Sequence, residues 1–319
     1  MIKIGIDIGA TKTVIAYLDE SGNLSAFLKV PSEKILTEKR DAVDSLKYFI
    51  DGYIQNNHLD KKEIKGIGIG VPAVLDSMTQ QIVSCPNLPG LDNLPLSKLL
   101  SPKINLPILV ENDVNLIAVG EHTYGRGKGF DDLACIFVGT GLGCGLILRG
   151  QLYTGADGAA AEFGHTIYDP DGRICGCGGQ GCVEMYCSGK ALTLEAKENL
   201  EELEIKPTES EIFEGRFTLA EKVIKSAHAG NIKARNILDR SFYILGLAIT
   251  NLVNILNPRL IILGGGIITG WPEAIKIVRE TVYKRARTVN RDRLVIDFPL
   301  LGEKAGLYGA AQLVEMSVK

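Results

Sequence analysis

Four side chains that commonly bind metal ions lie between residues 165 and 182. His165 is followed by Cys175, Cys177 and Cys182, and glycines are frequent around the cysteines. Three thiolates and one imidazole make a complete tetrahedral ligand set for zinc, and glycines allow a short loop to fold tightly around the ion. The pattern therefore predicts a structural zinc site, whereas His165 alone would be interpreted as a hydrogen-bonded core residue.

Two glutamates flank this cluster. Glu162 lies three residues before His165, and Glu184 lies two residues after Cys182. Carboxylates held beside a rigid metal loop can accept hydrogen bonds from the hydroxyl groups of a sugar. If His165 binds zinc through one ring nitrogen, its other nitrogen remains for a partner. Either glutamate could instead be a solvated surface charge, but the nearby metal loop favours a binding role.

Three glycine-rich turns follow apolar runs. The segment Asp7–Thr13 reads Asp-Ile-Gly-Ala-Thr-Lys-Thr, Gly139–Gly143 reads Gly-Thr-Gly-Leu-Gly, and Gly264–Gly266 is a glycine triplet. Small residues let the backbone approach an anion closely, threonine and lysine supply donors, and Asp7 could hold a hydrated magnesium ion. Neither of the first two turns is a P-loop. One turn alone would be interpreted as a tight hairpin, but three turns after strands favour a nucleotide-binding cleft.

An Asn-Asp pair follows another apolar run. The default interpretation of Asn112-Asp113 is that one of them caps a helix. The alternative is that the aspartate is a general base, because a hydroxyl group that attacks a γ-phosphate needs a carboxylate to take its proton. The carboxyl ends of strands are also where α/β folds place ligands.

Apolar runs bounded by turn residues predict the elements that position these side chains. A run, a small-residue turn and a second run predict a β-hairpin at residue 2 and another at residue 133. Helical spacing predicts a helix over residues 42–54, and a long helix from about Asn231 ends before Pro258. Alternating strands and helices indicate an α/β architecture, and the two similar openings suggest two domains with a boundary near Gly120. The expected strands are Ile2–Ile8, Val14–Leu18, Ile64–Gly70, Pro107–Glu111, Leu133–Val138, Gly145–Leu148, Arg259–Leu263 and Leu294–Phe298.

Composition narrows the class of protein. The chain has 319 residues, of which 45% are hydrophobic, and a formal net charge of −3, which gives no reason to expect nucleic acid or an anionic membrane as a partner. The apolar stretch Tyr243–Leu256 is too short to span a bilayer, and the N-terminus reads as a strand and not as a signal peptide. We therefore expect a cytoplasmic protein. In a reducing compartment the clustered cysteines favour a metal site, and Cys85, Cys135, Cys144 and Cys187 are expected to be buried apolar residues.

Together these motifs resemble the ROK family of sugar kinases and repressors, within the actin-like ATPase superfamily. The resemblance covers nearly the whole chain, and two alanines, Ala10 and Ala73, stand where glycine is usual in the family. The motifs that carry it are Asp7–Thr13, Gly70–Ala73, Glu111–Asp113, Val138–Gly145, Glu162–His165 and Cys175–Glu184.

The resemblance implies an ATP-dependent kinase that phosphorylates the C6 hydroxyl group of a hexose, with glucose to glucose 6-phosphate as the favoured reaction and Asp113 as the catalytic base. His165, Cys175, Cys177 and Cys182 would bind structural Zn²⁺. The sugar would be held by Asn87, Asn112, Asp113, Glu162, His165 and Glu184. ATP with Mg²⁺ would contact Asp7, Gly9, Ala10, Thr11, Lys12, Gly139, Thr140, Gly141, Gly143, Gly264, Gly265 and Gly266.

The family resemblance also implies a fold of two α/β domains, related to ribonuclease H, with an interdomain cleft. The expected domains are residues 1–119 together with a C-terminal helix at about 305–319, and residues 120–304 with the zinc loop. Members commonly form homodimers or homotetramers. The alternatives are a kinase of N-acetylglucosamine or N-acetylmannosamine, less readily of fructose or allose, or a sugar-sensing regulator. Regulators of this family carry a winged helix ahead of the first motif, and only six residues precede Asp7 here.

Overall fold

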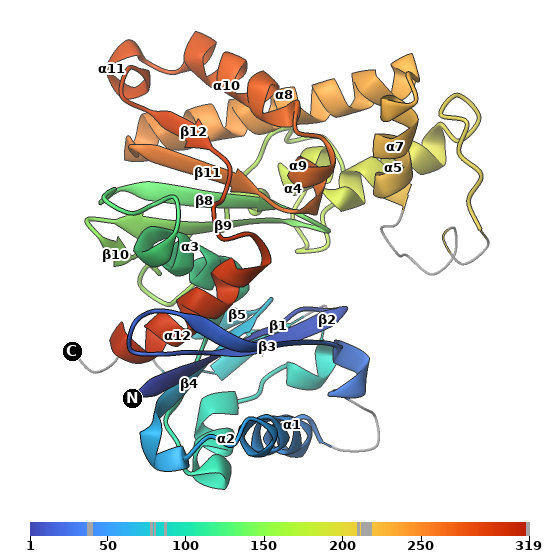
Figure 1. The fold of residues 1–319 in the computed structure, drawn as a ribbon. Coiled ribbons are helices and arrows are strands. Elements are labelled where there is room, and N and C mark those ends of the chain that lie inside the picture. The colour runs from blue at the N-terminus through green and yellow to red at the C-terminus, as the bar shows by residue number, and fades with distance from the viewer. Residues whose placement is uncertain are drawn as a thin grey trace. The chain divides into compact units, whose positions relative to one another are not determined.

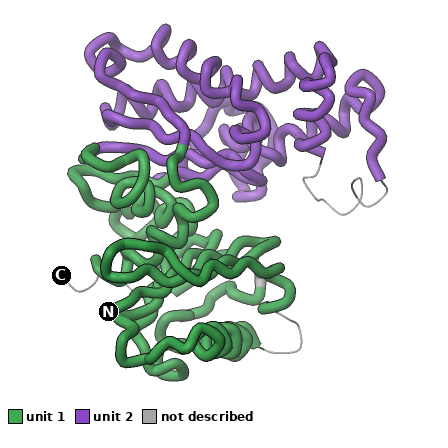
Figure 2. The backbone as a smooth tube through the Cα atoms, viewed as in Figure 1, with its two compact units in different colours: residues 1–131, 145–160, 299–319 green, residues 132–144, 161–298 purple. Residues whose placement is uncertain are grey.

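The computed structural model describes residues 1–36, 41–76, 79, 81–85, 88–208, 211 and 219–316. The chain divides into two compact units (Figure 2). Unit 1 comprises residues 1–131, 145–160 and 299–319, and unit 2 comprises residues 132–144 and 161–298. The domain boundaries expected from the sequence stay a prediction.

Five strands form the sheet of unit 1: β1 (Ile2–Ile8), β2 (Lys12–Leu18), β3 (Leu24–Pro31), β4 (Ile64–Val71) and β7 (Ile108–Asn112). Their order is β3-β2-β1-β4-β7; β1, β2 and β3 are antiparallel, whereas β4 and β7 run parallel to β1. The register aligns Asp7 with Gly70, and Gly70 with Glu111, so the carboxyl ends of β1, β4 and β7 meet at one edge of the sheet. A separate hairpin pairs β5 (Val74–Asp76) with β6 (Gln81–Ser84).

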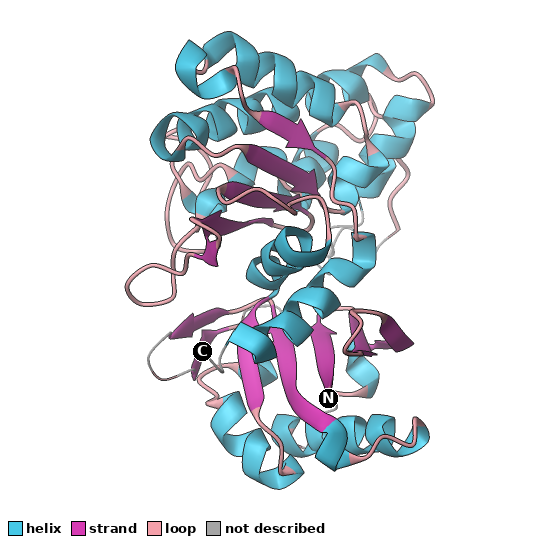
Figure 3. Ribbon diagram, turned by 60° about the vertical axis from the view of Figure 1, so that its left-hand side comes forward, coloured by secondary structure: helices cyan, strands magenta, loops and turns pink. Residues whose placement is uncertain are grey.

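Helices cover both faces of this sheet (Figure 3). The helices of unit 1 are α1 (Ala42–Asn56), α2 (Leu96–Ile104), α3 (Asp113–Tyr124) and α12 (Ala305–Met316). Glycines allow α12 to approach β4 and α3 at backbone distance, because an ideal Cβ atom at Gly68 would lie 1.8 Å from the carbonyl oxygen of Ala310, and one at Gly309 would lie 1.8 Å from that of Leu116. On the opposite face, Leu46 and Ile50 of α1 and Leu100 of α2 join the buried isoleucines of the strands in one core.

The second sheet has the order β10-β9-β8-β11-β12, with β11 parallel to β8 and β12. Its strands are β8 (Leu133–Val138), β9 (Leu142–Leu148), β10 (Gln151–Leu152), β11 (Leu260–Gly264) and β12 (Val295–Asp297), of which β9 begins in unit 2 and continues into unit 1. The strands expected from the apolar runs are therefore present in the two sheets, and β3 and β10 are additional ones.

The helices of unit 2 are α4 (Glu184–Cys187), α5 (Gly189–Glu198), α7 (Leu219–His228), α8 (Ile232–Leu256), α9 (Gly266–Gly270), α10 (Ala274–Arg285) and α11 (Thr288–Arg291) (Figure 1). Helix α8 ends at Leu256, and its C-cap residue Asn257 adopts the left-handed conformation directly before Pro258, where the sequence predicts the helix to stop. It packs against α10, where Gly246 faces the side chain of Thr281. Within the described ranges, no helix is both long enough and apolar enough to cross a lipid bilayer.

Candidate functional site

Three carboxyl groups gather where the parallel strands of unit 1 end. Asp7 lies near the end of β1, Glu111 near the end of β7, and Asp113 is the first residue of α3. All three side chains are partly buried. The register of β1, β4 and β7 places this cluster at one sheet edge, which is where ligands bind in α/β folds.

Asn112 caps α3. Its side-chain oxygen accepts hydrogen bonds from the backbone N–H groups of Val114 and Asn115, at 2.9 and 3.1 Å. Its amide group donates to the carbonyl oxygen of Ala73 at 3.2 Å. The capping interpretation is therefore confirmed for Asn112. One hydrogen of its amide group is used in the bond to Ala73, and the second can be donated to a ligand.

Burial raises the pKa values of these carboxyl groups. The pKa of Asp7 is raised to about 7 by burial and by the negative charge of Asp113, although the charge of Lys12 lowers it. Burial also raises the pKa of Asp113, against the effect of a hydrogen bond from the N–H group of Val114. The pKa of Glu111 is raised by burial as well. Carboxyl groups with raised pKa values are suited to proton transfer near neutral pH.

The first glycine turn is a tight hairpin held by a neighbouring serine. The N–H group of Gly9 donates to the carbonyl oxygen of Lys12 at 2.9 Å. Ser32 donates from its hydroxyl group to the carbonyl oxygen of Gly9 at 2.6 Å, and lies 2.9 Å from the hydroxyl oxygen of Thr13. The ammonium group of Lys12 forms an exposed ion pair with Glu303. The Ser32 and Glu303 contacts were not predicted from the sequence.

The second glycine turn belongs to unit 2 and is held by buried groups. The N–H group of Leu142 donates to Oε2 of Glu184 at 2.9 Å. The first N–H groups of α5, from Gly189 and Lys190, donate to the carbonyl oxygens of Gly139 and Thr140, at 2.8 and 3.1 Å. Of the residues predicted in this motif, Gly143 lies inside β9 and not in the turn.

A cavity of about 360 Å³ in unit 2 brings two of the predicted glycine motifs together. Gly139 and Thr140 of the second turn line it with Gly266 of the third. Gly265, which has φ +97°, lies so close to the end of β8 that an ideal Cβ atom there would be 2.3 Å from the carbonyl oxygen of Val138. The remaining lining residues are Gly189, Ala220, Glu221, Ile224, Lys225, Ile267 and Gly270. None of these was predicted from the sequence.

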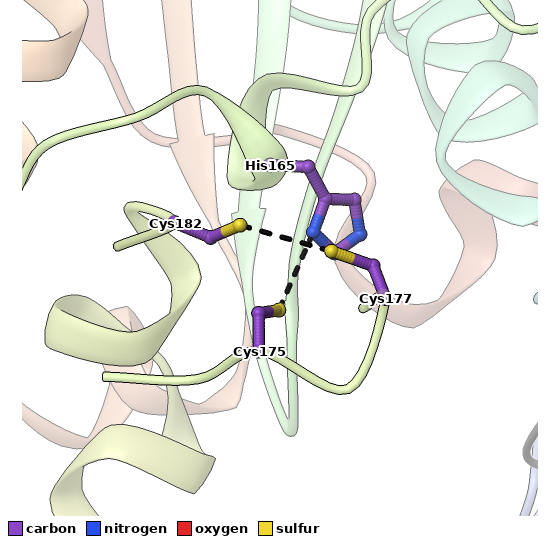
Figure 4. Close-up of side chains that lie close together, drawn as sticks. All are labelled: His165, Cys175, Cys177 and Cys182. Atoms are coloured by element: carbon purple, nitrogen blue, oxygen red, sulfur yellow. Dashed lines mark hydrogen bonds between the residues drawn. The ribbon is translucent and has the colours of Figure 1, made fainter. Parts of the chain in front are cut away.

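The four predicted metal ligands lie together in a loop of unit 2 (Figure 4). Their ligand atoms all lie within 4.8 Å of one another. Sγ of Cys175 is 3.7 Å from Nδ1 of His165, and Sγ of Cys177 is 3.7 Å from Sγ of Cys182. A tetrahedral zinc ion with Zn–S bonds of about 2.3 Å would separate its sulfur ligands by about 3.8 Å. The donor set and its spacing therefore fit zinc.

The two glutamates beside this loop differ in their surroundings. Oε2 of Glu162 lies 3.8 Å from Nε2 of His165, so the two ring nitrogens of the histidine face different partners. Glu184 is 6% exposed, and its Oε1 forms an ion pair with Lys190 at 3.1 Å. The remaining predicted sugar ligand, Asn87, lies outside the described residues.

The four isolated cysteines are buried, as predicted: Cys85, Cys135, Cys144 and Cys187. Burial raises the pKa of the Cys85 thiol to about 11 and that of the Cys144 thiol to about 12. A thiol with a raised pKa is a poor nucleophile at neutral pH. These residues therefore serve as small core side chains.

Comparisons with known proteins support one family. The sequence profile of the ROK family matches residues 3–317. A glucokinase from Streptomyces coelicolor is 34% identical over 98% of this chain and 97% of its own length. A ROK family glucokinase from Streptomyces griseus, solved in complex with glucose and AMPPNP, is 30% identical, with a TM-score of 0.79 over 99% of this chain and 100% of that one. A xylose repressor from Bacillus subtilis is 29% identical over 98% of this chain and 76% of its own length.

These matches extend over both units and include each of the motifs described above. The α/β fold of actin-like ATPases that was predicted from the sequence is confirmed by the structural match. Because the family profile spans almost every residue, the chain belongs to the ROK family.

Proposed function

We propose that this protein is an ATP-dependent hexose kinase that transfers the γ-phosphoryl group to the C6 hydroxyl group of glucose. The observation that carries the proposal is the position of Asp113, at the start of α3 beside Asp7, with a pKa raised by burial. The similarity to two glucokinases supports glucose as the substrate.

Asp113 acts as the general base in the proposed reaction. It accepts the proton of the C6 hydroxyl group while the sugar oxygen bonds to the γ-phosphorus atom and the bond from that phosphorus to the β–γ bridging oxygen breaks, so that ADP leaves. A raised pKa makes Asp113 a stronger proton acceptor. Backbone N–H groups of the glycine turns and Lys12 stabilise the negative charge of the phosphoryl group in transfer. When Mg²⁺ is bound, it neutralises charge on the triphosphate, and Asp7 is the carboxylate that would hold it.

Zn²⁺ would have a structural role in the loop of unit 2. His165 would bind it through Nδ1, the nitrogen that faces Cys175, and the three cysteines would complete the tetrahedron. Nε2 of His165 would then donate to the sugar or to Glu162. Asn112, Glu162 and Glu184 are the further proposed sugar ligands, together with Asn87.

Two alternatives follow from the sequence and the comparisons. An N-acetylhexosamine kinase would use the same base and the same nucleotide site, since these sugars differ from glucose at C2. A sugar-sensing regulator is supported by the similarity to a xylose repressor, but such a protein has no need of a base with a raised pKa.

A coupled assay of ADP release tests the proposal across glucose, N-acetylglucosamine, N-acetylmannosamine, fructose, allose and xylose. We expect glucose to give the highest kcat/KM. Asp113→Asn should fold normally and lose about 10²- to 10⁴-fold in kcat, the usual contribution of a general base.

Glu111→Gln is the matched control, because it changes a neighbouring, partly buried carboxyl group that accepts hydrogen bonds from Asn112 and Asn115. This variant should keep most of the turnover. Undiminished turnover in Asp113→Asn would reject the base role. Sugar binding without any ADP release in the wild type would favour the regulator.

A further inference from the structure

Glu184 is a buried carboxylate with two partners. It is the first residue of α4 and lies two residues after Cys182. Its Oε2 accepts a hydrogen bond from the N–H group of Leu142 at 2.9 Å, and its Oε1 forms an ion pair with Nζ of Lys190 at 3.1 Å. A carboxylate that is 6% exposed is stable only when such partners compensate its lost hydration. Both oxygens of Glu184 are thus engaged within unit 2.

Lys190 is connected to the second glycine turn in two ways. Its backbone N–H group donates to the carbonyl oxygen of Thr140 at 3.1 Å, beside the bond from Gly189 to Gly139. Its side chain contacts Glu184, which in turn bonds Leu142 on the far side of the turn. Gly141 lies against this carboxylate, since an ideal Cβ atom there would be 2.5 Å from Oε2. The turn is therefore enclosed between α5 and Glu184.

The same segment is connected to the metal-binding loop. Val183 donates its N–H group to the carbonyl oxygen of Thr166, the residue after His165, at 2.9 Å. Met185 donates to the carbonyl oxygen of Cys182 at 2.9 Å. The backbone that carries Glu184 is thus fixed at both ends of the metal cluster.

We propose that Glu184 and Lys190 form a brace through which the order of the metal-binding loop determines the affinity of the second glycine turn for a nucleotide. The inference rests on the proposed function, because it assumes that this turn and the adjoining cavity bind ATP. Lys190 is a positioning residue in this account. A sugar hydroxyl group that contacts Glu184 would also act on the nucleotide turn.

A simpler role for the pair would be to stabilise the corner between α4 and α5. The two roles differ in what they affect. A corner contact contributes to the stability of unit 2 alone, whereas a brace also changes nucleotide affinity in protein that remains folded.

The chain has a single tryptophan, which offers a direct readout of binding. Trp271 is fully buried and follows Gly270, a lining residue of the cavity that Gly139 and Thr140 also line. Titration with AMPPNP and Mg²⁺ can be followed by its fluorescence, and calorimetry gives the same dissociation constant without relying on the tryptophan.

Lys190→Met should weaken AMPPNP binding about ten-fold, within the range of typical coupling between sites. Lys190→Arg retains the ion pair and should bind within about two-fold of the wild type. Lys276→Met is the matched control, because it removes an equal charge from an exposed ion pair with Glu280 on α10, and it should not change the affinity. Wild-type protein stripped of metal by a chelator should lose affinity to a similar extent as Lys190→Met.

The proposal is overturned if folded Lys190→Met binds AMPPNP as the wild type does. If circular dichroism shows that Lys190→Met does not fold, the test is the AMPPNP affinity of the metal-stripped wild type. An affinity equal to that of the untreated protein would then overturn the proposal. A wild type that binds no AMPPNP at all would reject the proposed function together with the inference. A normal wild type with an unaffected variant would reject the inference alone.

Discussion

The first and second glycine turns join their strands in the same way, but different contacts hold them in place. Each follows a strand and leads into the second strand of a hairpin, at Gly9–Lys12 in unit 1 and at Gly139–Gly141 in unit 2. The first is held by the hydroxyl group of Ser32, and its lysine is engaged in an exposed ion pair. The second is held by the start of α5 and by the buried Glu184.

The difference teaches that similar turn sequences need not depend equally on their surroundings. Exposed ion pairs contribute little because water already solvates both charges. A buried carboxylate with fixed donors is costly to disturb, because its partners are left unsatisfied. The second turn should therefore respond more strongly to changes elsewhere in its unit than the first.

Metal removal should have the largest effect on this comparison. Structural zinc contributes several kcal/mol or more to the stability of the loop that binds it. The wild type should contain zinc, and stripping it should speed hydrogen exchange at residues 139–145 by much more than at residues 9–13. Elemental analysis and exchange mass spectrometry check this. Protein that is metal-free when isolated and fully stable would contradict the zinc assignment.

Asp7, which precedes the first turn, should make the stability of the protein depend on pH. The pKa of Asp7 in the folded protein is about 7, above the ordinary value of 3.8. Between about pH 4 and pH 7 the Asp7 carboxyl group is therefore protonated in the folded state and ionised in the unfolded state. The wild type should therefore lose stability as pH rises from about 4 to 7, by up to about 4 kcal/mol at 1.36 kcal/mol per pKa unit. Asp7→Asn should remove this loss, as urea unfolding across the pH range can measure. An unchanged pH dependence in the variant would refute the assignment.

Alanine substitutions compare the two turns directly. The Cβ atom of Gly141→Ala would lie 2.5 Å from Glu184, and overpacking of this kind costs about 1–3 kcal/mol. Gly9→Ala would place its Cβ atom 3.1 Å from a carbonyl oxygen, and Gly139→Ala would meet no atom within 4 Å. Thermal unfolding should rank the losses in that order. A larger loss in Gly9→Ala than in Gly141→Ala would break the comparison.

The smallest effect is expected at the exposed end of the first turn. Glu303→Gln removes the ion pairs with Lys12 and Lys29, and screening by water makes such pairs weak. The melting temperature should barely change, while Lys12 becomes available to a phosphate group. A marked drop in the melting temperature would show that the first turn relies on charge as much as the second.

Local patterns allowed much of the fold to be predicted. Strands such as β1 and β11 are short apolar runs before turn residues, and the long helix α8 ends where proline requires it. The edge strand β3 was missed because Phe27 and Leu28 are both exposed, so its apolar residues do not alternate. The spacing of the zinc ligands was also informative, since all four come from one short segment.

The contacts that support the site were harder to predict. Lys12 and Glu303 are 291 residues apart, and nothing in a single sequence pairs them. Glu184 was predicted as a sugar ligand from its place beside the metal loop, but its bonds to Leu142 and Lys190 depend on how α5 meets the turn. Tertiary contacts of this kind become visible only when the fold is known.

The glycine-lined seat of α12 has a consequence for the order in which the chain can acquire its structure. Gly5 and Gly68 in the strands and Gly120 in α3 leave space that the backbone of α12 fills. During translation, residues 305–316 leave the ribosome after the other helices and strands that the structure describes. The face of the unit 1 sheet that α12 covers therefore stays uncovered until the end of synthesis. Unit 2, in contrast, already has its complete sequence by residue 298.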